Sequence, residues 1–325
     1  KVTLLKTAKA AHSQLLSPQA EFANLYVTEL GRGCSRGCRF CTAGFIYRPP
    51  RLWDADAVIK GLEERGESVK RIGLLGMEMA DEEELASLST YLLDSGCSLS
   101  FSSLRADRIS GALLKLLGSS GLKSVAIAPD GASERLRRVI NKNLTEEDIL
   151  LAAERLVEAG LYKLKLYFMI GLPTESHEDI DEMIRTIYSI LKIDRRIHIN
   201  LSIASFIPKP HTPFQWEAME NEESLKNKIR YIREMVKSGR VNLKFSDTAQ
   251  SLLEGIFSRG DRKLGRVILR AFQKGCRFDS WKDLVGRDYL KNLQYWRESF
   301  REEGIEPDFY LYRTRPYHEK LPWDH

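Results

Sequence analysis

Three cysteines near the start of the chain are the clearest candidates for chemistry. Cys34, Cys38 and Cys41 have C-x3-C-x2-C spacing, in a loop that is also rich in glycine and arginine. Glycine lets a backbone turn tightly, so a loop of this kind can fold three thiolates around one metal centre. The sequence therefore predicts a metal site with Cys34, Cys38 and Cys41 as its ligands.

Zinc and an iron–sulfur cluster are the two centres to compare, with three buried structural thiols as the alternative to both. Structural zinc takes four ligands, and no histidine or fourth cysteine lies nearby in the sequence. A 4Fe–4S cluster held by three thiolates keeps one iron open for a substrate or cofactor. Cys97 and Cys276 lie outside any ligand spacing and are expected to be small buried side chains. An iron–sulfur cluster is favoured, and a zinc-binding interaction module is the more distant alternative.

The composition is that of a folded globular protein. Hydrophobic residues make up 43% and charged residues 29% of the 325 residues. No run approaches the about 18 consecutive apolar residues of a membrane helix, and the first residues lack a signal or transit pattern. We therefore expect a cytoplasmic protein without a membrane span. The net charge of +5 permits acidic partners but does not indicate nucleic acid.

Apolar runs of strand length alternate with helical patterns from residue 25 to about residue 238. This alternation is typical of βα units on a parallel sheet. Six units with short connections favour an α/β fold, a partial (βα)6 TIM-like barrel, over a full eight-stranded barrel. A doubly wound sheet is the alternative. The expected strands are Leu25–Leu30, Arg71–Leu75, Ser98–Ser102, Ser124–Ala128, Leu164–Ile170 and Ile197–Ser205.

The pattern divides the chain into three regions. Residues 1–22 are expected to form a linker or an amphipathic helix, and residues 23–240 the barrel. Residues 241–325 are expected to form a mainly helical C-terminal extension, which starts with one more strand in "VNLKFSD".

The string "CSRGCRFC" resembles the signature of the radical S-adenosylmethionine (SAM) enzymes, including the aromatic Phe40 before the last cysteine. The longer string "GRGCSRGCRFCTAGFIYRPPR" resembles an uncharacterised subgroup that often carries an upstream cobalamin-binding-like domain. The resemblance implies a 4Fe–4S cluster that binds SAM and reductively cleaves it to a 5′-deoxyadenosyl radical. It also implies a reductant such as flavodoxin or ferredoxin, and it allows cobalamin from a domain outside this chain.

If the resemblance holds, the later strands should end in groups that contact parts of SAM. Gly76 and Glu78 resemble the Gly-Gly-Glu motif that holds the SAM amino group, with Met77 in place of the second glycine. Ser103 and Arg105 resemble the polar pair near the SAM carboxylate, and an arginine fork suits a carboxylate. The alternatives are an exposed acid at a helix start for Glu78 and a surface ion pair for Arg105.

Strands four and five continue the resemblance. Asp130, where a glutamate is usual, and Ser133 are expected near the SAM ribose. "MIGLPTES" is similar to the family's "IxGLPGET" turn, with Thr174 in place of the second glycine, and this turn is expected beside adenine. The residues assigned to that contact are Ile170, Gly171 and Leu172.

Alternation along the fifth strand puts Lys163, Lys165, Tyr167 and Met169 on one face. If that face points into the barrel, Lys165 and Tyr167 become candidates for catalysis or for contact with substrate or SAM. His211 replaces the glycine of a "PxPGTP"-like turn after strand six, where a turn role is favoured over proton transfer.

The arginines of the cysteine loop have two interpretations. They either tune the cluster and meet an acidic reductant, or form a solvated basic rim. They are Arg32, Arg36, Arg39, Arg48 and Arg51.

The substrate is not predicted by the sequence, and three alternatives to a simple radical SAM enzyme stay open. A cobalamin-dependent methyltransferase is one, although no Asp-x-His-x-x-Gly cobalamin motif occurs. A tRNA methylthiotransferase-like enzyme would need an RNA-binding module and usually a second cluster, neither of which is evident. A non-catalytic iron–sulfur or SAM-binding protein would keep the fold without cleaving SAM.

Overall fold

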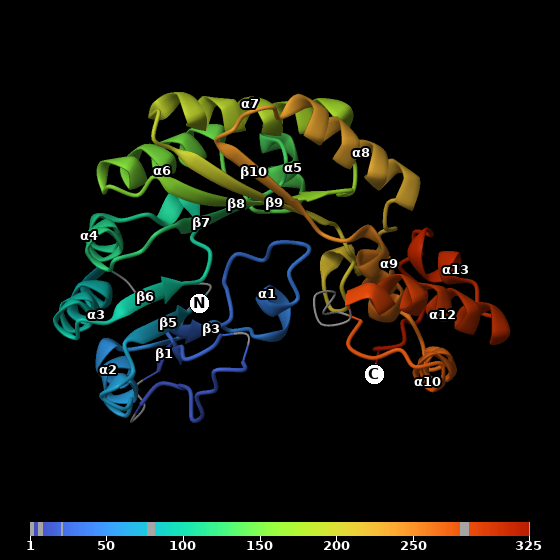
Figure 1. The fold of residues 1–325 in the computed structure, drawn as a ribbon, viewed down its shortest axis with the longest axis horizontal. Coiled ribbons are helices and arrows are strands. Elements are labelled where there is room, and N and C mark those ends of the chain that lie inside the picture. The colour runs from blue at the N-terminus through green and yellow to red at the C-terminus, as the bar shows by residue number, and fades with distance from the viewer. Residues whose placement is uncertain (1–2, 6–8, 21, 77–81, 280–285, 325) are drawn as a thin grey trace.

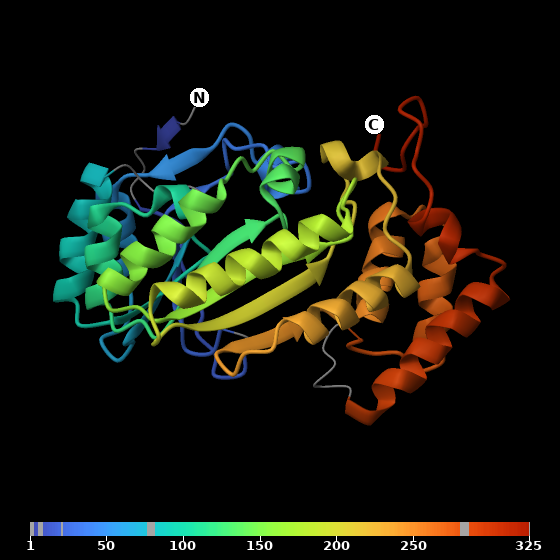
Figure 2. The ribbon, with the colours of Figure 1, turned by 90° about the horizontal axis from the view of Figure 1, so that it is seen from above.

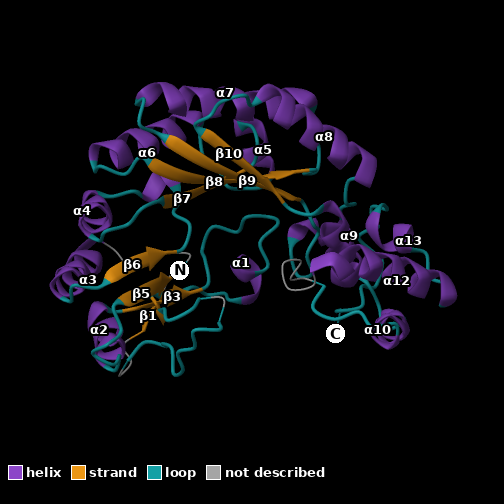
Figure 3. Cartoon of the chain, viewed as in Figure 1, coloured by secondary structure: helices purple, strands orange, loops and turns teal. Residues whose placement is uncertain are grey.

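Parallel strands form the centre of the molecule, with helices on their outer side (Figures 1 and 3). The computed structural model describes residues 3–5, 9–20, 22–76, 82–279 and 286–324. The strands are β1 (Thr3–Leu5), β2 (Tyr26–Glu29), β3 (Gly31–Arg32), β4 (Arg51–Trp53), β5 (Arg71–Leu75), β6 (Ser98–Phe101), β7 (Val125–Asp130), β8 (Lys163–Ile170), β9 (His198–Ser205) and β10 (Val241–Phe245).

The strands follow one another around the sheet in sequence order. β2, β5 and β6 pair in parallel, as do β7, β8, β9 and β10, and a parallel bridge between Leu104 and Ile127 joins the two groups. A doubly wound sheet would reverse its order at a switch point, whereas a barrel does not. Among the described strands β10 has no pairing with β2. The fold is therefore α/β with a partial TIM-like barrel, as expected.

All six expected strands are confirmed, with bounds that differ by at most two residues. The expected strand in "VNLKFSD" is β10, which pairs in parallel with β9 from Val241 to Phe245. It therefore extends the barrel sheet, and the helical part of the C-terminal region begins after it.

The N-terminal segment was expected to be a linker or a helix, and its described part is not helical. In the described part of residues 1–22, β1 pairs in parallel with β4, and residues 9–20 contain no helix. His12 forms an antiparallel bridge with Thr28, and the backbone N–H of Ala10 donates to the carbonyl of Ala57 at 2.8 Å. Pairing with the barrel satisfies these backbone groups and outweighs the weak local preference for helix.

Amphipathic helices cover the outer face of the sheet. α7 shows the pattern: Ser176 and Asp179 form its capping box, and its buried residues recur at helical spacing from Ile180 to Leu191. No helix in the described ranges is both long and apolar enough to cross a membrane. The barrel helices are α1 (Ala43–Ile46), α2 (Ala55–Glu63), α3 (Glu82–Asp94), α4 (Gly111–Ser119), α5 (Glu134–Val139), α6 (Glu146–Glu158), α7 (His177–Ile193) and α8 (Glu222–Met235).

The C-terminal helices lie beyond the carboxyl ends of β8 and β9 (Figure 2). The backbone N–H of Met219 donates to the carbonyl of Leu311 at 2.9 Å, and a Cβ on Gly255 would lie 2.8 Å from the Leu311 side chain. The region thus packs against the turn after β9, on the side of the barrel where catalytic loops lie. Its helices are α9 (Thr248–Arg259), α10 (Leu264–Gln273), α12 (Tyr289–Glu302) and α13 (Pro307–Leu311).

Candidate functional site at the cysteine loop

The cysteine loop is closed at its base by two short strands. β3 and β4 pair antiparallel, with Gly31 opposite Leu52 and Arg32 opposite Arg51. A Cβ on Gly31 would lie 2.5 Å from the Leu52 side chain, so only glycine allows this approach. The stretch "GFIYRPPR" is therefore the returning half of the same loop, and both ends are fixed beside the carboxyl end of β2.

Within the loop the three cysteines are half-buried. The N–H of Cys41 donates to the carbonyl of Cys38 at 3.0 Å, and the chain then enters α1. The described residues contain no group of three or more His, Cys, Asp or Glu arranged around a single ion. Structural zinc needs four ligands on one ion, whereas a 4Fe–4S cluster binds each of three thiolates on a different iron. The three-thiol donor set fits such a cluster.

Two turns from distant parts of the chain hold the loop in place. The backbone N–H of Arg39 donates to the carbonyl of Ile140 at 2.9 Å, and its own carbonyl accepts from the N–H of Phe214 at 3.2 Å. The Asn141 amide donates to the carbonyl of Gly37 at 3.0 Å. The loop is thus tied to the turn after α5 and to the turn after β9, which position it over the ends of β7 and β9.

Several loop arginines have structural contacts. Arg32 pairs with Glu29 at 2.8 Å, and Arg48 donates to the carbonyl of Gly44 at 2.6 Å. The Arg39 guanidinium donates to the carbonyl of Val139. Three of the five arginines therefore hold the loop together, a role that the sequence did not indicate.

Gly33 is the tightest point of the loop and supports a prediction about stability. Its φ is +93°, and a Cβ there would lie 2.1 Å from the carbonyl oxygen of Tyr47. We expect Gly33→Ala to lower the free energy of unfolding by about 2 kcal/mol, measured by urea denaturation. Gly44→Ala is the matched control, because a Cβ there meets Cys41 Sγ at an ordinary 3.8 Å. Equal stability of the two variants would contradict the prediction.

Lys142, which the sequence did not indicate as a site residue, contacts both Asp130 and Arg105 near the cysteine loop. Its ammonium group pairs with Asp130, and its carbonyl accepts from Arg105 Nη2 at 2.8 Å. Burial raises the pKa of the Cys38 thiol, while the charge of Lys142 acts in the opposite direction. Burial likewise raises the pKa of Asp130 against the effect of Lys142. A cation near Cys38 favours the thiolate form that a metal requires.

The "INKN" string is the sequence signal for the turn that carries Lys142, because asparagines flank the lysine on both sides. Asn141 and Asn143 have φ of 57° and 51°, a conformation that asparagine tolerates better than most residues. The two left-handed residues form the turn that positions Lys142 between them.

Arg105 has the surface contact that was considered as its alternative role. Its Nε donates to Asp107 at 2.8 Å, and the side chain is 14% exposed. Burial raises the pKa of the Cys38 thiol, and the positive charge of Arg105 acts against that rise. The two roles are therefore compatible, because Asp107 and the Lys142 carbonyl orient the guanidinium beside the loop.

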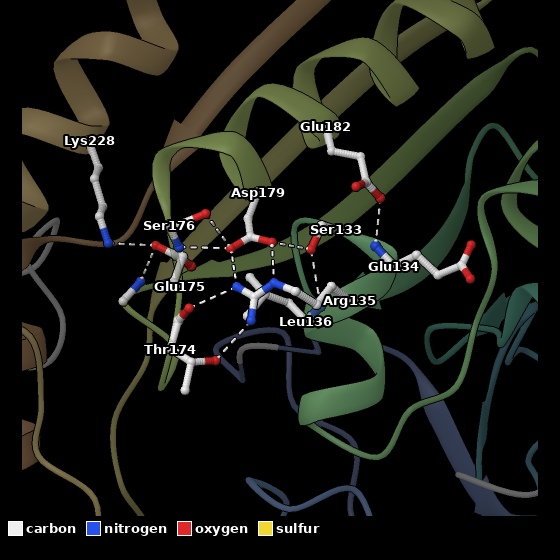
Figure 4. A network of polar contacts seen from close by, with 11 residues as sticks. Ser133, Glu134, Arg135, Leu136, Thr174, Glu175, Ser176, Asp179, Glu182 and Lys228 are labelled. Atoms are coloured by element: carbon white, nitrogen blue, oxygen red, sulfur yellow. Dashed lines mark hydrogen bonds and ion pairs between the residues drawn. The ribbon is translucent and has the colours of Figure 1, made fainter.

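Some predicted SAM contacts have other contacts in the structure. Ser133 is buried at the N-terminus of α5, where its hydroxyl accepts from the N–H of Leu136 at 3.0 Å and donates to Asp179 (Figure 4). Ile170 is 1% exposed on the helix-covered face of β8, and Leu172 is also buried. Glu78 lies outside the described residues.

The turn after β8 is fixed by the network in Figure 4. Gly171, with φ of 79°, donates its N–H to Glu175 at 2.9 Å. Arg135 pairs with Asp179 and donates to the carbonyl of Thr174 at 2.7 Å. Burial alone would raise the pKa of Asp179, but hydrogen bonds from Arg135, Ser133 and Ser176 lower it. The network therefore holds the ends of β7 and β8 in one arrangement.

Thr174 and His211 both have positive φ, of 67° and 60°. These are the positions where the sequence departs from a glycine of the family turns. The left-handed backbone explains why glycine suits positions 174 and 211. The positive φ of His211 agrees with the turn role that the sequence favoured for this residue.

Within the described residues, two cavities border the barrel strands. The larger, about 480 Å³, lies at the base of the cysteine loop and is lined by residues that include Gly31, Gly33, Gly76 and Ser102. Ser102 Oγ donates to the carbonyl of Gly76 at 2.9 Å. Ser102 also lines the smaller cavity, of about 250 Å³. The two cavities therefore adjoin at this residue.

The smaller cavity contains three of the predicted residues, Ser103, Lys165 and Tyr167. The burial of β8 alternates as expected, with Lys165 and Tyr167 exposed and Leu164 and Leu166 buried under the helices. The predicted alternation along this strand is thus confirmed, and Lys165 and Tyr167 line the same cavity. Phe40, by contrast, packs partly buried against the core beside the cysteines.

Residues 28–187 match the model of the radical SAM superfamily. The chain belongs to the radical SAM superfamily. A radical SAM domain implies a 4Fe–4S cluster and SAM as cofactors, in agreement with the donor set of the cysteine loop. The match begins in β2 and ends in α7, so it contains the cysteine loop and the ends of β5 to β8.

Two similar proteins place this radical SAM domain among larger relatives. An uncharacterized protein of Methanocaldococcus jannaschii is 36% identical over 257 residues, which are 78% of this chain and 56% of that protein. The anaerobic magnesium-protoporphyrin IX monomethyl ester cyclase of Cereibacter sphaeroides is 22% identical, over 89% of this chain and 48% of that protein. The chain thus spans about half the length of these curated relatives.

A solved structure supports the fold. The radical S-adenosylmethionine methyltransferase TsrM from Kitasatospora setae, with cobalamin and a [4Fe-4S] cluster bound, has a TM-score of 0.51 and 12% identity. The similarity covers 85% of this chain and 61% of that one.

Proposed function

We propose that this chain is the catalytic core of a radical SAM enzyme and that Cys34, Cys38 and Cys41 bind its 4Fe–4S cluster. The observation that carries the proposal is the placement of the three thiols in one clamped loop at the carboxyl end of the first barrel strand. When bound, the cluster and SAM would supply a 5′-deoxyadenosyl radical for reaction with an unidentified substrate.

The larger cavity is the proposed place for the methionine end of SAM. It adjoins the loop backbone and contains Gly76, which the family resemblance assigns to the SAM amino group. Arg105 and Lys142 lie beside Cys38 and offer positive charge for the SAM carboxylate. Asp130 at the end of β7 is the proposed acceptor for a ribose hydroxyl. The hydroxyl of Ser133 is already engaged at the start of α5, so it is not part of this proposal.

The shape of the turn after β8 suits adenine through its backbone. Gly171 is held by Glu175, and the strand before it presents Met169 rather than Ile170 to the barrel interior. We therefore propose that Met169 and the backbone of Gly171 and Leu172 flank the adenine.

Anaerobic reconstitution with iron and sulfide tests the proposal. The protein should bind about four irons per chain, and adding dithionite and SAM should produce 5′-deoxyadenosine, measured by liquid chromatography. Stoichiometric zinc without iron incorporation would overturn the proposal. An intact cluster that binds SAM but never cleaves it would instead support the non-catalytic alternative.

Cobalamin and the reductant are further proposals. TsrM is described with cobalamin bound, and a cobalamin-dependent variant of the chemistry is the second candidate function. The cobalamin would then come from a domain outside this chain. An acidic protein such as flavodoxin or ferredoxin is the proposed electron donor, and exposed Arg39, whose guanidinium donates to a backbone carbonyl, offers positive charge in the cluster loop.

A further inference from the structure

The smaller cavity exists because two neighbouring strands separate. β6 and β7 are joined by the bridge between Leu104 and Ile127, where the N–H of Leu104 donates to the carbonyl of Ala126 at 2.7 Å. On the amino-terminal side of this bridge the ladder does not continue, and the strands lie in separate sheets. The gap between them forms the cavity of about 250 Å³.

The lining of this cavity is cationic and rich in hydrogen-bond donors. Lys123 and Lys165 both line it, together with Tyr167 and four serines, and no acidic residue is part of the lining. Within the described residues neither lysine forms an ion pair, although ion pairs occupy many other charged side chains of the chain. Both lysines are exposed to solvent, and two positive charges that line one hollow attract an anion more strongly than a single surface lysine does.

The position of Lys165 depends on the sheet register. Lys165 lies opposite Ala126 on β7, whose small side chain leaves room at the cavity wall. Tyr167 follows on the same face, one step nearer the carboxyl end of β8. The donors therefore extend from Lys123, two residues before β7, toward Ser102, which also borders the cavity at the cysteine loop.

We propose that this cavity binds an anionic group of the substrate, either a carboxylate or a phosphate, through Lys123 and Lys165. The inference rests on the proposed function, because it places the substrate next to the cavity assigned to SAM. Ammonium, hydroxyl and phenol groups all donate to the oxygens of such an anion. The adjoining cavities then keep the reacting part of the substrate near Ser102, on the side of the cysteine loop.

Lysine labelling in the presence of small anions tests the proposal. The reconstituted full chain is treated briefly with an amine-acetylating reagent at constant ionic strength, with inorganic phosphate, pyrophosphate or citrate as the probe. Mass spectrometry measures the acetylation rate of each lysine. A probe at twice its dissociation constant occupies two thirds of the sites, so the rate at Lys123 and Lys165 should fall about threefold.

Lys163 and Lys244 are the internal controls. Lys163 is exposed on the same face of β8, two residues before Lys165, and Lys244 is exposed on β10, but neither lines the cavity. Protection by phosphates and not by citrate would assign a phosphate group, and the reverse would assign a carboxylate. Protection that is absent with all three probes, or equal at all four lysines, would overturn the proposal.

Two variants distinguish anion binding in the cavity from a general effect of removing one positive charge. Lys165→Gln should abolish the protection of Lys123, whereas Lys163→Gln should leave it unchanged. Iron content and 5′-deoxyadenosine formation are measured on the same preparations. Acetylation is measured independently of SAM cleavage. Missing protection of the lysines would therefore contradict the anion site, whereas missing 5′-deoxyadenosine would contradict the radical SAM assignment.

Discussion

Replacing Cys38 with alanine is expected to reduce 5′-deoxyadenosine formation to the level seen without protein. Cys38 lies between Cys34 and Cys41 in the clamped loop, within range of the positive charge of Lys142. Without its thiolate one iron loses its protein ligand, and a cluster held by only two cysteines in this chain should not persist. The same outcome is expected for Cys34→Ala and Cys41→Ala. Iron per chain and deoxyadenosine after dithionite and SAM are the measurements.

The remaining two cysteines provide matched controls. Cys97 is buried, with its Sγ 3.6 Å from the carbonyl of Val69. Burial raises the pKa of the Cys276 thiol to about 11, so it stays protonated and is a poor metal ligand. Cys97→Ala and Cys276→Ala should therefore keep the iron content of the parent protein. Full activity in any of the three loop variants would show that the ligand assignment is wrong.

Lys228→Met is expected to lower the free energy of unfolding by about 3 kcal/mol at neutral pH, measured by urea denaturation. Lys228 Nζ lies 2.7 Å from Glu175 (Figure 4) and 2.6 Å from Glu220, and the Glu175 side chain is only 1% exposed. Glu175 Oε2 already lacks a hydrogen-bond partner. Without the lysine, two carboxylates face each other in a largely buried site.

The effect of Lys228→Met should depend on pH. Burial raises the pKa of Glu175 even though Lys228 lowers it, so removing Lys228 raises that pKa further. A carboxyl whose folded pKa exceeds its unfolded value of about 4.3 binds its proton more tightly in the folded state. Stability of the variant therefore falls as pH rises from that value through the raised folded pKa. The loss relative to the parent protein should be smaller at pH 5 than at pH 8.

Lys226→Met is the control for this experiment. Lys226 pairs with Glu222 one helical turn away on the surface of α8, and its side chain is 58% exposed. We expect this change to cost less than about 0.5 kcal/mol at either pH. An equal loss at pH 5 and pH 8 in Lys228→Met would contradict the proposed electrostatic cause.

The cysteine spacing and the strand–helix repeat were sufficient to predict the family and the barrel. Both are local features: the ligand spacing lies within eight residues, and each βα unit shows its own periodicity. The alternation that puts Lys165 and Tyr167 on the inner face of β8 is likewise a property of one strand. The sequence alone therefore determined the fold class and the alternation along β8, and it predicts which loop holds the cluster.

Other parts of the site depend on contacts between distant residues. Arg39 reaches Ile140, and Lys142 joins Asp130 to Arg105, because neighbouring strands bring their following loops together. No periodicity marks such residues, since each contact depends on the register between strands and on the turn that follows. For the same reason the sequence assigned Ser133 to the ribose, whereas the structure engages its hydroxyl at the start of α5.

The cavity with Lys123 and Lys165 is the clearest example of what only the tertiary structure decided. The two lysines lie 42 positions apart in the sequence and share a cavity because β6 and β7 separate below a single bridge. Residue types and spacing specify the chemistry that one loop can perform. The cavity in which a substrate would lie beside that loop is defined by how the strands pair. Pairing determines which side chains from distant segments line the same cavity.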